Sequence, residues 1–464
     1  MLLFGNTKII IYIWADLKNL TIMSSIFEYG PVNPVFKSPT PGVISIVAGI
    51  PNEGDSPLDD ELCQQLSECG FNAAAAVIST NNSGISTSLE NCYNHGISLF
   101  IGNGNLYNQY LTPFIDSYKN RKGLGGWFMK LNLSPKELEN INTGKDTSLL
   151  DSYNKIKKSD PDHPTLLGLG GDWNLDRNGD AISSYPDYVA KFQKKFEPSF
   201  WPILFFPDVM KGKETDVPEA RQLMFYKTLQ YFAYISRFTS TPFWFTCRCQ
   251  AFKDYNGYNA QAPTLSMLRG IVFTALAYGA QGIYYWNYRQ NYNSGSTVFS
   301  DAPVKLNGLV KNDTIWDIVK TVNKEIQDYN KIFCGCEVID CRHVTKLSHN
   351  KSLKTMDGTV TDTVDDSLRS LPMGPLTGVS YLGTDLLISH IFNNEENYLV
   401  IVNDPFHAEI LDNPIKKQVR FNFNFYWKIY RCQSENGVLT QTEITNNLKS
   451  YTLNPGDYLI FKWE

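Results

Sequence analysis

The chain has 464 residues, which is long for one ordinary domain and suits a large domain followed by a smaller one. Its 42 basic and 47 acidic residues nearly balance, and no run of five basic residues occurs, so we expect no nucleic-acid partner. No apolar run reaches the roughly 18 residues that a membrane-spanning helix requires, so we expect no membrane span.

The N-terminal segment has a short apolar patch, Ile9 to Trp14, followed by charged residues. It lacks a small-residue cleavage site after a long apolar region, which is what a secretory signal requires. We therefore expect residues 1–40 to form a leader and lead-in segment, with Met23 as an alternative start that would leave residues 1–22 outside the native protein. The lack of a clear signal favours the cytoplasm.

Eight short apolar segments between residues 43 and 288 predict buried β-strands separated by amphipathic helices. They recur about every 34 residues, which fits a strand, a helix and two loops. The strands are apolar on both faces, as parallel strands covered by helices must be. We predict an α/β fold, a (β/α)8 TIM barrel over 41–333, with strands at 43–49, 71–78, 97–102, 124–130, 165–170, 200–206, 242–249 and 282–288.

The helices between these strands carry start and stop signals. Ser56 and Pro57 predict an N-cap and a first helical residue, and Gly70 predicts the end of the same helix. Later in the barrel, residues 219–235 show apolar positions at helical spacing, and Asp313 predicts the cap of a helix that reaches Tyr329.

After residue 333 the apolar period changes from that of a helix to that of a strand. Residues 385–392, 397–404, 418–425 and 457–463 read as strands, and 345–370 reads as a long polar loop. We therefore predict a smaller all-β sandwich domain over 334–464.

Nine cysteines at irregular spacing argue against a disulfide framework and favour buried free thiols. Cys247 and Cys249 are expected on one face of a strand. The group of Cys334, Cys336, Cys341 and His343 does not have the spacing of a zinc site. We expect no cofactor.

In a TIM barrel the active site lies at the carboxyl ends of the strands, which form the mouth. Here these positions carry asparagines, aromatic rings and a few charges, a mixture that fits a carbohydrate ligand, although loops are rich in such residues in any case. The candidate catalytic carboxylates are Asp208, Asp172 and Glu53, with Asp176 as a further mouth carboxylate. The candidate substrate-binding residues are Trp127, Lys130, Asn132, Trp173, Arg248, Gln250, Trp286, Tyr288 and Arg289. Strand alternation offers an alternative for Trp127, as a core residue turned toward the helices.

The loop at 171–180 presents oxygen side chains at alternate positions, like the start of a calcium-binding loop. Tyr185 stands where such a loop needs a bidentate glutamate. We therefore favour a plain polar loop without metal, and keep calcium as the weaker alternative, with Asn174, Asp176, Asn178 and Asp180 as its ligands.

Several stretches resemble TIM-barrel glycoside hydrolases of Bacteroides-type bacteria, trans-glycosidase-like barrels that carry a C-terminal β-sandwich domain. The similar stretches cover most of residues 43–464, and AYGAQGI with the following YW is the most specific. They are LDDELCQQLSECGFNA (58–73), GGWFMK (125–130), YPDYVAKFQKKFEPSFWP (185–202), PTLSMLRGIVFTALAYGAQGIYYWNY (263–288), NYLVIVN (397–403) and LNPGDYLIFKW (453–463). The resemblance implies a carbohydrate ligand and a periplasmic or cell-surface location.

The chain departs from this family where the chemistry is expected. The resemblance implies Asp-Glu-Pro after the fourth strand, where this chain has Leu131, Asn132 and Leu133. It also implies an aspartate in the sixth strand, where Leu204 stands. Glycoside hydrolysis normally needs two carboxyl groups, and neither leucine nor an amide replaces one.

Three interpretations follow from these residues. The chain is an active O-glycosyl hydrolase with displaced acids, a catalytically silent barrel that binds glycan, or a structural component that uses its β domain as an interface. The sugar, the linkage and the oligomeric state are not determined by these patterns.

Overall fold

The structure is a computed structural model. It describes residues 42–51, 58–78, 82–170, 185–211, 219–253, 258–293, 297–305, 311–344, 352–354, 360–363, 373–381, 386–406, 417–424, 426–435 and 437–464. Within these ranges no helix combines the length and the apolarity needed to cross a lipid bilayer.

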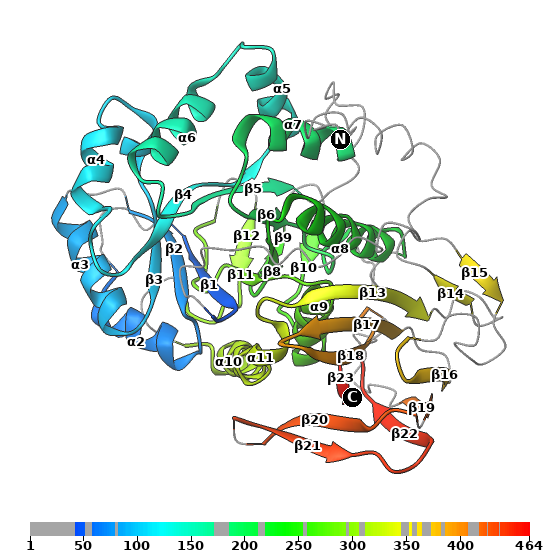
Figure 1. The fold of residues 1–464 in the computed structure, drawn as a ribbon. Coiled ribbons are helices and arrows are strands. Elements are labelled where there is room, and N and C mark those ends of the chain that lie inside the picture. Colours follow the sequence, from blue (N-terminus) through cyan, green and yellow to red (C-terminus); the bar gives the residue numbers. More distant parts are fainter. Residues whose placement is uncertain are drawn as a thin grey trace.

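Eight parallel strands form a closed barrel in which the first strand pairs with both the second and the last (Figure 1). All eight predicted strands are confirmed, and so is the TIM-barrel fold. The strands are β1 (Ser45–Ile50), β2 (Ala73–Val77), β3 (Ser98–Gly102), β4 (Leu124–Leu133), β5 (Thr165–Gly170), β6 (Trp201–Leu204), β8 (Phe243–Arg248) and β11 (Gly282–Trp286).

Helices surround this barrel on the outside, as Figure 1 shows. They are α2 (Asp60–Glu68), α3 (Asn82–Asn94), α4 (Leu111–Tyr118), α5 (Pro135–Asn142), α6 (Ser148–Ser159), α7 (Tyr185–Phe196), α8 (Glu219–Thr239), α9 (Leu265–Ala277), α10 (Asp313–Asp328) and α11 (Asn330–Phe333), with a 3-10 turn η2 (Gly104–Tyr107) before α4.

Two predicted helix caps are wrong, and one helix end is confirmed. Asp59 caps α2 in place of Ser56, because the Asp59 carboxylate accepts a hydrogen bond from the amide of Leu62. The N-cap position of α10 is Asn312, and Asp313 is the first helical residue. Gly70 ends α2 as predicted, with a φ of +85° that favours glycine.

Alternating strand residues divide the barrel core into two layers. Val47, Phe100, Trp244 and Tyr284 belong to the cluster that fills the barrel interior. Their strand neighbours pack outward against the helices. Both faces are therefore apolar, and the sequence pattern alone does not say which face is inside.

A small antiparallel sheet stands at the mouth, and the sequence pattern did not predict it. It is built from β7 (Met210–Lys211), β9 (Ala251–Lys253), β10 (Tyr258–Ala260) and β12 (Val298–Ser300), in the order β12-β9-β10-β7. These short strands follow barrel strands β6, β8 and β11, so they lie beyond the carboxyl ends of the barrel strands.

Antiparallel sheets form the C-terminal part of the chain. An eight-stranded sheet contains β13 (Glu337–Val344), β14 (Ser352–Lys354), β15 (Val360–Thr363), β17 (Leu386–Asn393), β18 (Glu396–Asn403), β20 (Ile429–Glu435), β21 (Val438–Glu443) and β23 (Tyr458–Trp463). A three-stranded sheet contains β16 (Leu376–Tyr381), β19 (Lys417–Phe423) and β22 (Leu448–Leu453). The four predicted strands are confirmed. The predicted loop at 345–370 contains β14 and β15, which corrects that expectation.

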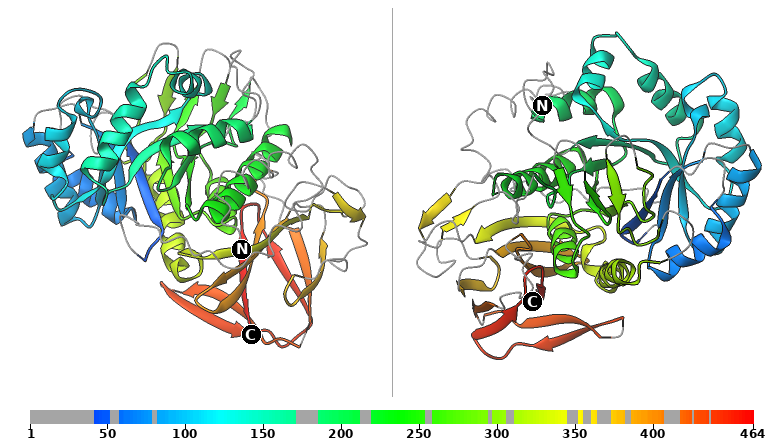
Figure 2. Two further views of the ribbon diagram at one scale, coloured as in Figure 1. Left: turned by 45° about the horizontal axis from the view of Figure 1, so that its top comes forward. Right: turned by 180° about the vertical axis from the view of Figure 1, so that it is seen from behind.

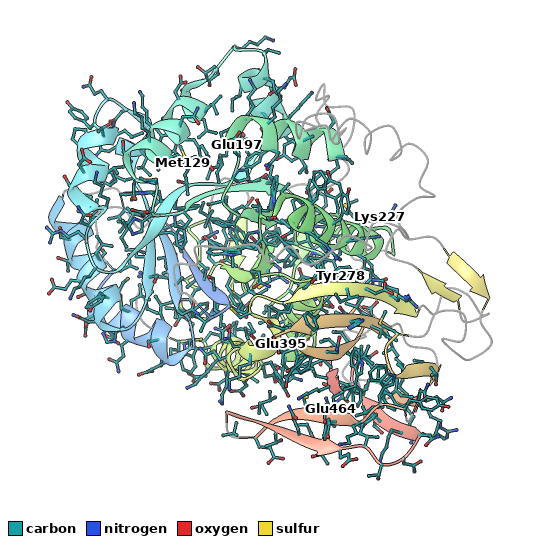
Figure 3. All side chains as sticks on the ribbon, viewed as in Figure 1. Met129, Glu197, Lys227, Tyr278, Glu395 and Glu464 are labelled. Carbon is teal, nitrogen blue, oxygen red and sulfur yellow. The ribbon has the colours of Figure 1, made fainter. Side chains whose placement is uncertain are left out.

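The eight-stranded sheet lies against one side of the barrel, away from α3 and α4 (Figure 2). Alternate residues of β17 and β18 join either the barrel's outer core or a separate core shared with the three-stranded sheet. Tyr278, at the end of α9, lies where the barrel meets β13 (Figure 3), and its hydroxyl is 2.6 Å from Nε2 of His343. The barrel and the sheet therefore share one continuous apolar interior.

Candidate functional site

A buried ion pair joins two neighbouring strand ends at the mouth. Arg248 is the last residue of β8, and Asp208 follows the adjacent strand β6. The guanidinium of Arg248 donates to the carboxylate of Asp208 and to the carbonyl of Gln250. The two charged side chains are only 2% and 5% exposed. Asp208 is thus brought to the mouth as predicted, but its carboxylate faces a cation inside the protein.

Gln250 fastens the loop after β11 to the end of β8. Its Oε1 accepts from the backbone amide of Asn291 at 3.2 Å. The side-chain oxygen of Asn291 in turn accepts from the side-chain amide of Asn287 at 2.6 Å. Gln250 itself is fully buried. Gln250 therefore holds the loop after β11 in place, and its buried side chain is not exposed to a ligand at the mouth.

Four half-buried rings form a mouth aromatic cluster, which we define as Phe206, Phe252, Trp286 and Phe299. Trp286 is its centre, with ring centroids 5.1 Å from Phe206, 6.0 Å from Phe252 and 5.7 Å from Phe299. Phe252 and Phe299 are directly paired across β9 and β12. The small sheet therefore brings two rings over the last barrel strand. Trp286 was predicted from the sequence, but the three phenylalanines were not.

The end of β4 carries an ion pair that the sequence analysis missed. Lys130 donates to Glu137, which lies in the first turn of α5. Glu137 also accepts from the amide and hydroxyl of Ser134, which completes a capping box. The spacing Ser-x-x-Glu at 134–137 was the sequence signal for it.

Partial burial acts to raise the pKa of Glu137, but hydrogen bonds from Lys130 and Ser134 outweigh this effect and hold the pKa below its ordinary value. A general acid must instead carry a proton at the working pH. These contacts favour the ionised form of Glu137.

Apolar side chains and one amide occupy the positions where acids were expected. Leu131 and Phe128 pack against the interior cluster, and Leu133 is fully buried in the outer layer. Leu204 is half-buried at the end of β6. Asn132 is exposed beside the end of β5, where a Cβ placed on Gly170 would lie 3.0 Å from its side-chain oxygen. Only Asn132 of this stretch offers polar atoms to a ligand.

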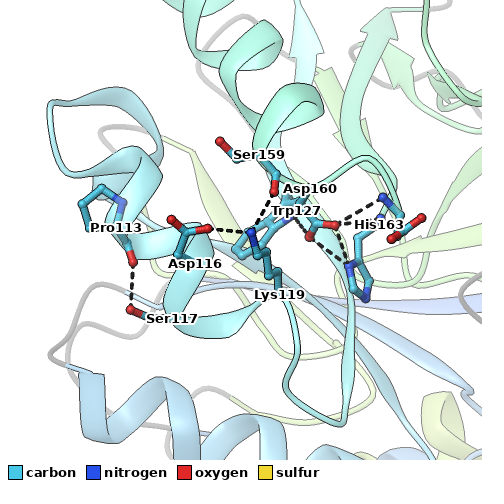
Figure 4. Close-up of polar contacts among 9 residues, drawn as sticks. Pro113, Asp116, Ser117, Lys119, Trp127, Ser159, Asp160 and His163 are labelled. Carbon is cyan, nitrogen blue, oxygen red and sulfur yellow. Dashed lines mark hydrogen bonds and ion pairs between the residues drawn. The ribbon is translucent and has the colours of Figure 1, made fainter.

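Two predicted stacking residues are core residues instead. Trp127 is fully buried, its ring lies 6.0 Å from that of Phe114, and its indole donates to Asp160 at 2.9 Å (Figure 4). Tyr288 is also fully buried, and its hydroxyl accepts from the indole of Trp316 at 3.0 Å. Both side chains point outward from the barrel, so neither ring face is open to a ligand.

Arg289 follows Tyr288 in the chain and is half-buried, and its backbone bridges to Val304. The remaining candidates lie outside the described residues: Glu53, Asp172, Trp173, Asn174, Asp176, Asn178 and Asp180. In the part of the chain that is described, no group of three His, Cys, Asp or Glu residues is placed to hold a metal ion.

No protein-family model matches the chain, and no curated protein sequence matches it. Solved structures are similar to it in fold. A GH42 β-galactosidase from G. stearothermophilus, Gan42B, is 8% identical, with a TM-score of 0.46, over 92% of this chain and 99% of that one. A β-galactosidase from the psychrophilic Marinomonas ef1 is 9% identical, with a TM-score of 0.44, over 61% of this chain and 60% of that one.

Gas2p of Saccharomyces cerevisiae, solved in complex with laminaripentaose, is 12% identical, with a TM-score of 0.40, over 59% of this chain and 60% of that one. This chain thus spans about three fifths of the length of the Marinomonas and Saccharomyces proteins.

Proposed function

We propose that the mouth of this barrel binds a carbohydrate chain and that the protein is a catalytically silent relative of glycoside hydrolases. The observation that carries the proposal is the mouth aromatic cluster, in which the half-buried Trp286 lies among three phenylalanines. Aromatic faces suit the C–H side of a sugar ring, and the exposed amide of Asn132 both donates to and accepts from hydroxyl groups.

The second half of the proposal rests on the carboxylates that follow β4 and β6. Glu137 is bound to Lys130, and Asp208 is bound to Arg248 inside the protein. A glycosidase needs one carboxyl group that carries a proton and a second that is free to attack or to activate water. Neither of these two carboxylates is free for such a role in this structure.

The test is binding of a panel of neutral plant and host oligosaccharides, measured by calorimetry and tryptophan fluorescence. We expect Trp286→Ala to weaken binding by about two- to tenfold, because a lost stacking contact is worth about 0.5–1.5 kcal/mol. Trp427→Ala is the matched control, since Trp427 is exposed on the C-terminal sheets. Unchanged affinity in Trp286→Ala would refute the assignment of the site.

An active hydrolase with displaced acids is the competing function. It is tested by turnover of aryl glycosides and of the same oligosaccharides, with Asp208→Asn as the variant. We expect no turnover from the wild-type protein. Turnover by the wild-type protein would overturn the silent assignment, while leaving the binding site in place. Its loss in an Asp208→Asn variant that is still folded, as judged by circular dichroism, would identify Asp208 as a displaced acid.

A further inference from the structure

Two cysteines on neighbouring helices place their sulfur atoms in contact. Cys63 on α2 and Cys92 on α3 have Sγ atoms 3.6 Å apart, and both residues are fully buried. They are separated by 29 positions in the chain. Among the nine cysteines, which are all free thiols, the described structure brings no other two sulfur atoms together in this way.

Polar contacts near the start of α2 hold the two helices in this register. The amide of Leu58 donates to Ser88 at 2.9 Å, and the side chain of Asn91 donates to the carbonyl of Leu58 at 2.8 Å. One helical turn from the thiols, Nε2 of His95 lies within hydrogen-bonding distance of the Asp60 carboxylate, at 2.9 Å. The thiol contact is therefore a fixed feature of the α2–α3 packing.

A disulfide bond needs its two sulfur atoms about 2.05 Å apart. From 3.6 Å the sulfur atoms must approach by about 1.5 Å, a movement on the scale of small side-chain rotations. Both side chains already point into the same contact.

We propose that Cys63 and Cys92 are a modification site at which a peroxide forms an intramolecular disulfide, joining the first two β/α units of the barrel. One thiolate attacks a peroxide oxygen, which gives a sulfenic acid and releases the other oxygen as water. The second sulfur displaces the hydroxyl of the sulfenic acid, which leaves as a second water. The two thiols together lose two electrons and two protons, and one hydrogen peroxide becomes two waters.

The surroundings of the pair set the rate of this reaction. The hydrogen bond between the two thiols and the burial of the pair both raise the pKa of Cys92 well above its ordinary value. Because the thiolate is the reactive form, oxidation is slow near neutral pH and accelerates as the pH rises. Once the disulfide has formed, the same burial shields it from reductants. The site thus acts as a slow, durable crosslink.

The test uses the folded full-length protein, treated with hydrogen peroxide at pH 7 and pH 9 and then alkylated. Digestion after glutamate is needed, because no lysine or arginine separates Cys63 from Cys92. Cleavage after three residues places the two cysteines on different peptides: Glu61, Glu68 and Glu90. We expect one crosslinked pair of peptides, two hydrogens lighter than their sum, formed faster at pH 9.

Cys69 lies on the peptide between these two and serves as an internal control, since its thiol contacts the carbonyl of Trp316 at 3.8 Å instead. We expect the oxidised protein to melt a few degrees higher than the reduced one, and Cys92→Ala to abolish this difference while Cys432→Ala preserves it. Recovery of Cys63 and Cys92 as separate alkylated or sulfinic residues, or a crosslink that includes Cys69, would overturn the proposal.

Discussion

Arg248 and Asp208 form a buried ion pair across the carboxyl ends of the adjacent barrel strands β8 and β6. Each side chain also has a buried atom without a hydrogen-bond partner in the described structure, Nε of Arg248 and Oδ1 of Asp208. Two charges removed from water are tolerated because each neutralises the other. The pair therefore links the ends of β6 and β8 at the mouth, and the burial of each charge depends on the other.

Removing one member of this pair is expected to destabilise the protein strongly. Arg248→Met leaves the Asp208 carboxylate buried and unpaired, which costs about 3–5 kcal/mol of unfolding free energy. The double variant Asp208→Leu with Arg248→Met removes both charges and is expected to recover most of that loss. Urea unfolding of the single and double variants measures the coupling. Losses that simply add would show that the two residues act independently.

Trp127 and Asp160 give a second prediction, because the hydrogen bond between them belongs to the core and not to the mouth. Trp127→Phe keeps an aromatic side chain but leaves the Asp160 carboxylate without its indole donor, which is expected to cost about 1–3 kcal/mol. Oligosaccharide affinity is expected to stay unchanged, in contrast to Trp286→Ala. Weaker glycan binding by a well-folded Trp127→Phe variant would show that Trp127 does contribute to the ligand site.

Asp160 also makes the unfolding free energy depend on pH in the acidic range. Burial acts to raise its pKa, but hydrogen bonds from His163 and Trp127 outweigh this and hold the pKa below its ordinary value. The stabilisation is therefore present above the ordinary carboxyl pKa of about 4 and is lost as the pH falls below it. Asp160→Asn is expected to flatten the unfolding free energy below pH 4. Urea unfolding from pH 6 to pH 2.5 checks this, and an unchanged acid slope would contradict it.

The calcium alternative at 174–180 lies outside the described residues and remains a prediction. The sequence favours a loop without metal, because the twelfth position is Tyr185 and not glutamate. We therefore expect a chelator to leave the melting temperature unchanged. A fall in melting temperature that added calcium reverses would establish the site.

The barrel was predictable because its strands are short, apolar and evenly spaced, and each of them was found where the pattern placed it. The orientation of single residues was not predictable on the same grounds. Trp127 and Trp244 look alike in the sequence, yet one packs outward and the other fills the interior. When both faces of a strand are apolar, alternation has no polar reference to fix its phase.

The mouth was the least predictable part. Strands of two or three residues, such as β7 and β9, are too short to show any period, so the small sheet and its two phenylalanines went unseen. Ion pairs such as Asp208 with Arg248 join residues 40 positions apart, and only the pairing of β6 with β8 brings them together. Glu137 is different, because its capping-box spacing was visible in the sequence.

The contact between the barrel and the C-terminal sheet gives a final prediction. Phe273 of α9 and Tyr458 of β23 stack with ring centroids 3.7 Å apart and ring planes at 11°. Nearby, Gly456 has a φ of +75°, and a Cβ placed on it would lie 1.9 Å from the carbonyl oxygen of Ser266. Such close packing over a shared core indicates that the two parts unfold together.

Tyr458→Ala is therefore expected to lower the unfolding free energy by about 2–4 kcal/mol, through the lost stacking contact and the cavity that it leaves. The variant is expected to keep a single unfolding transition, because unfolding of the C-terminal sheet would expose the outer core that the barrel shares with it. Tyr426→Ala is the matched control, since Tyr426 is 93% exposed and its loss should change little. Calorimetry on both variants decides the matter. Two separate transitions in Tyr458→Ala would mean that the sheet is an independent module, attached to a barrel that is stable without it.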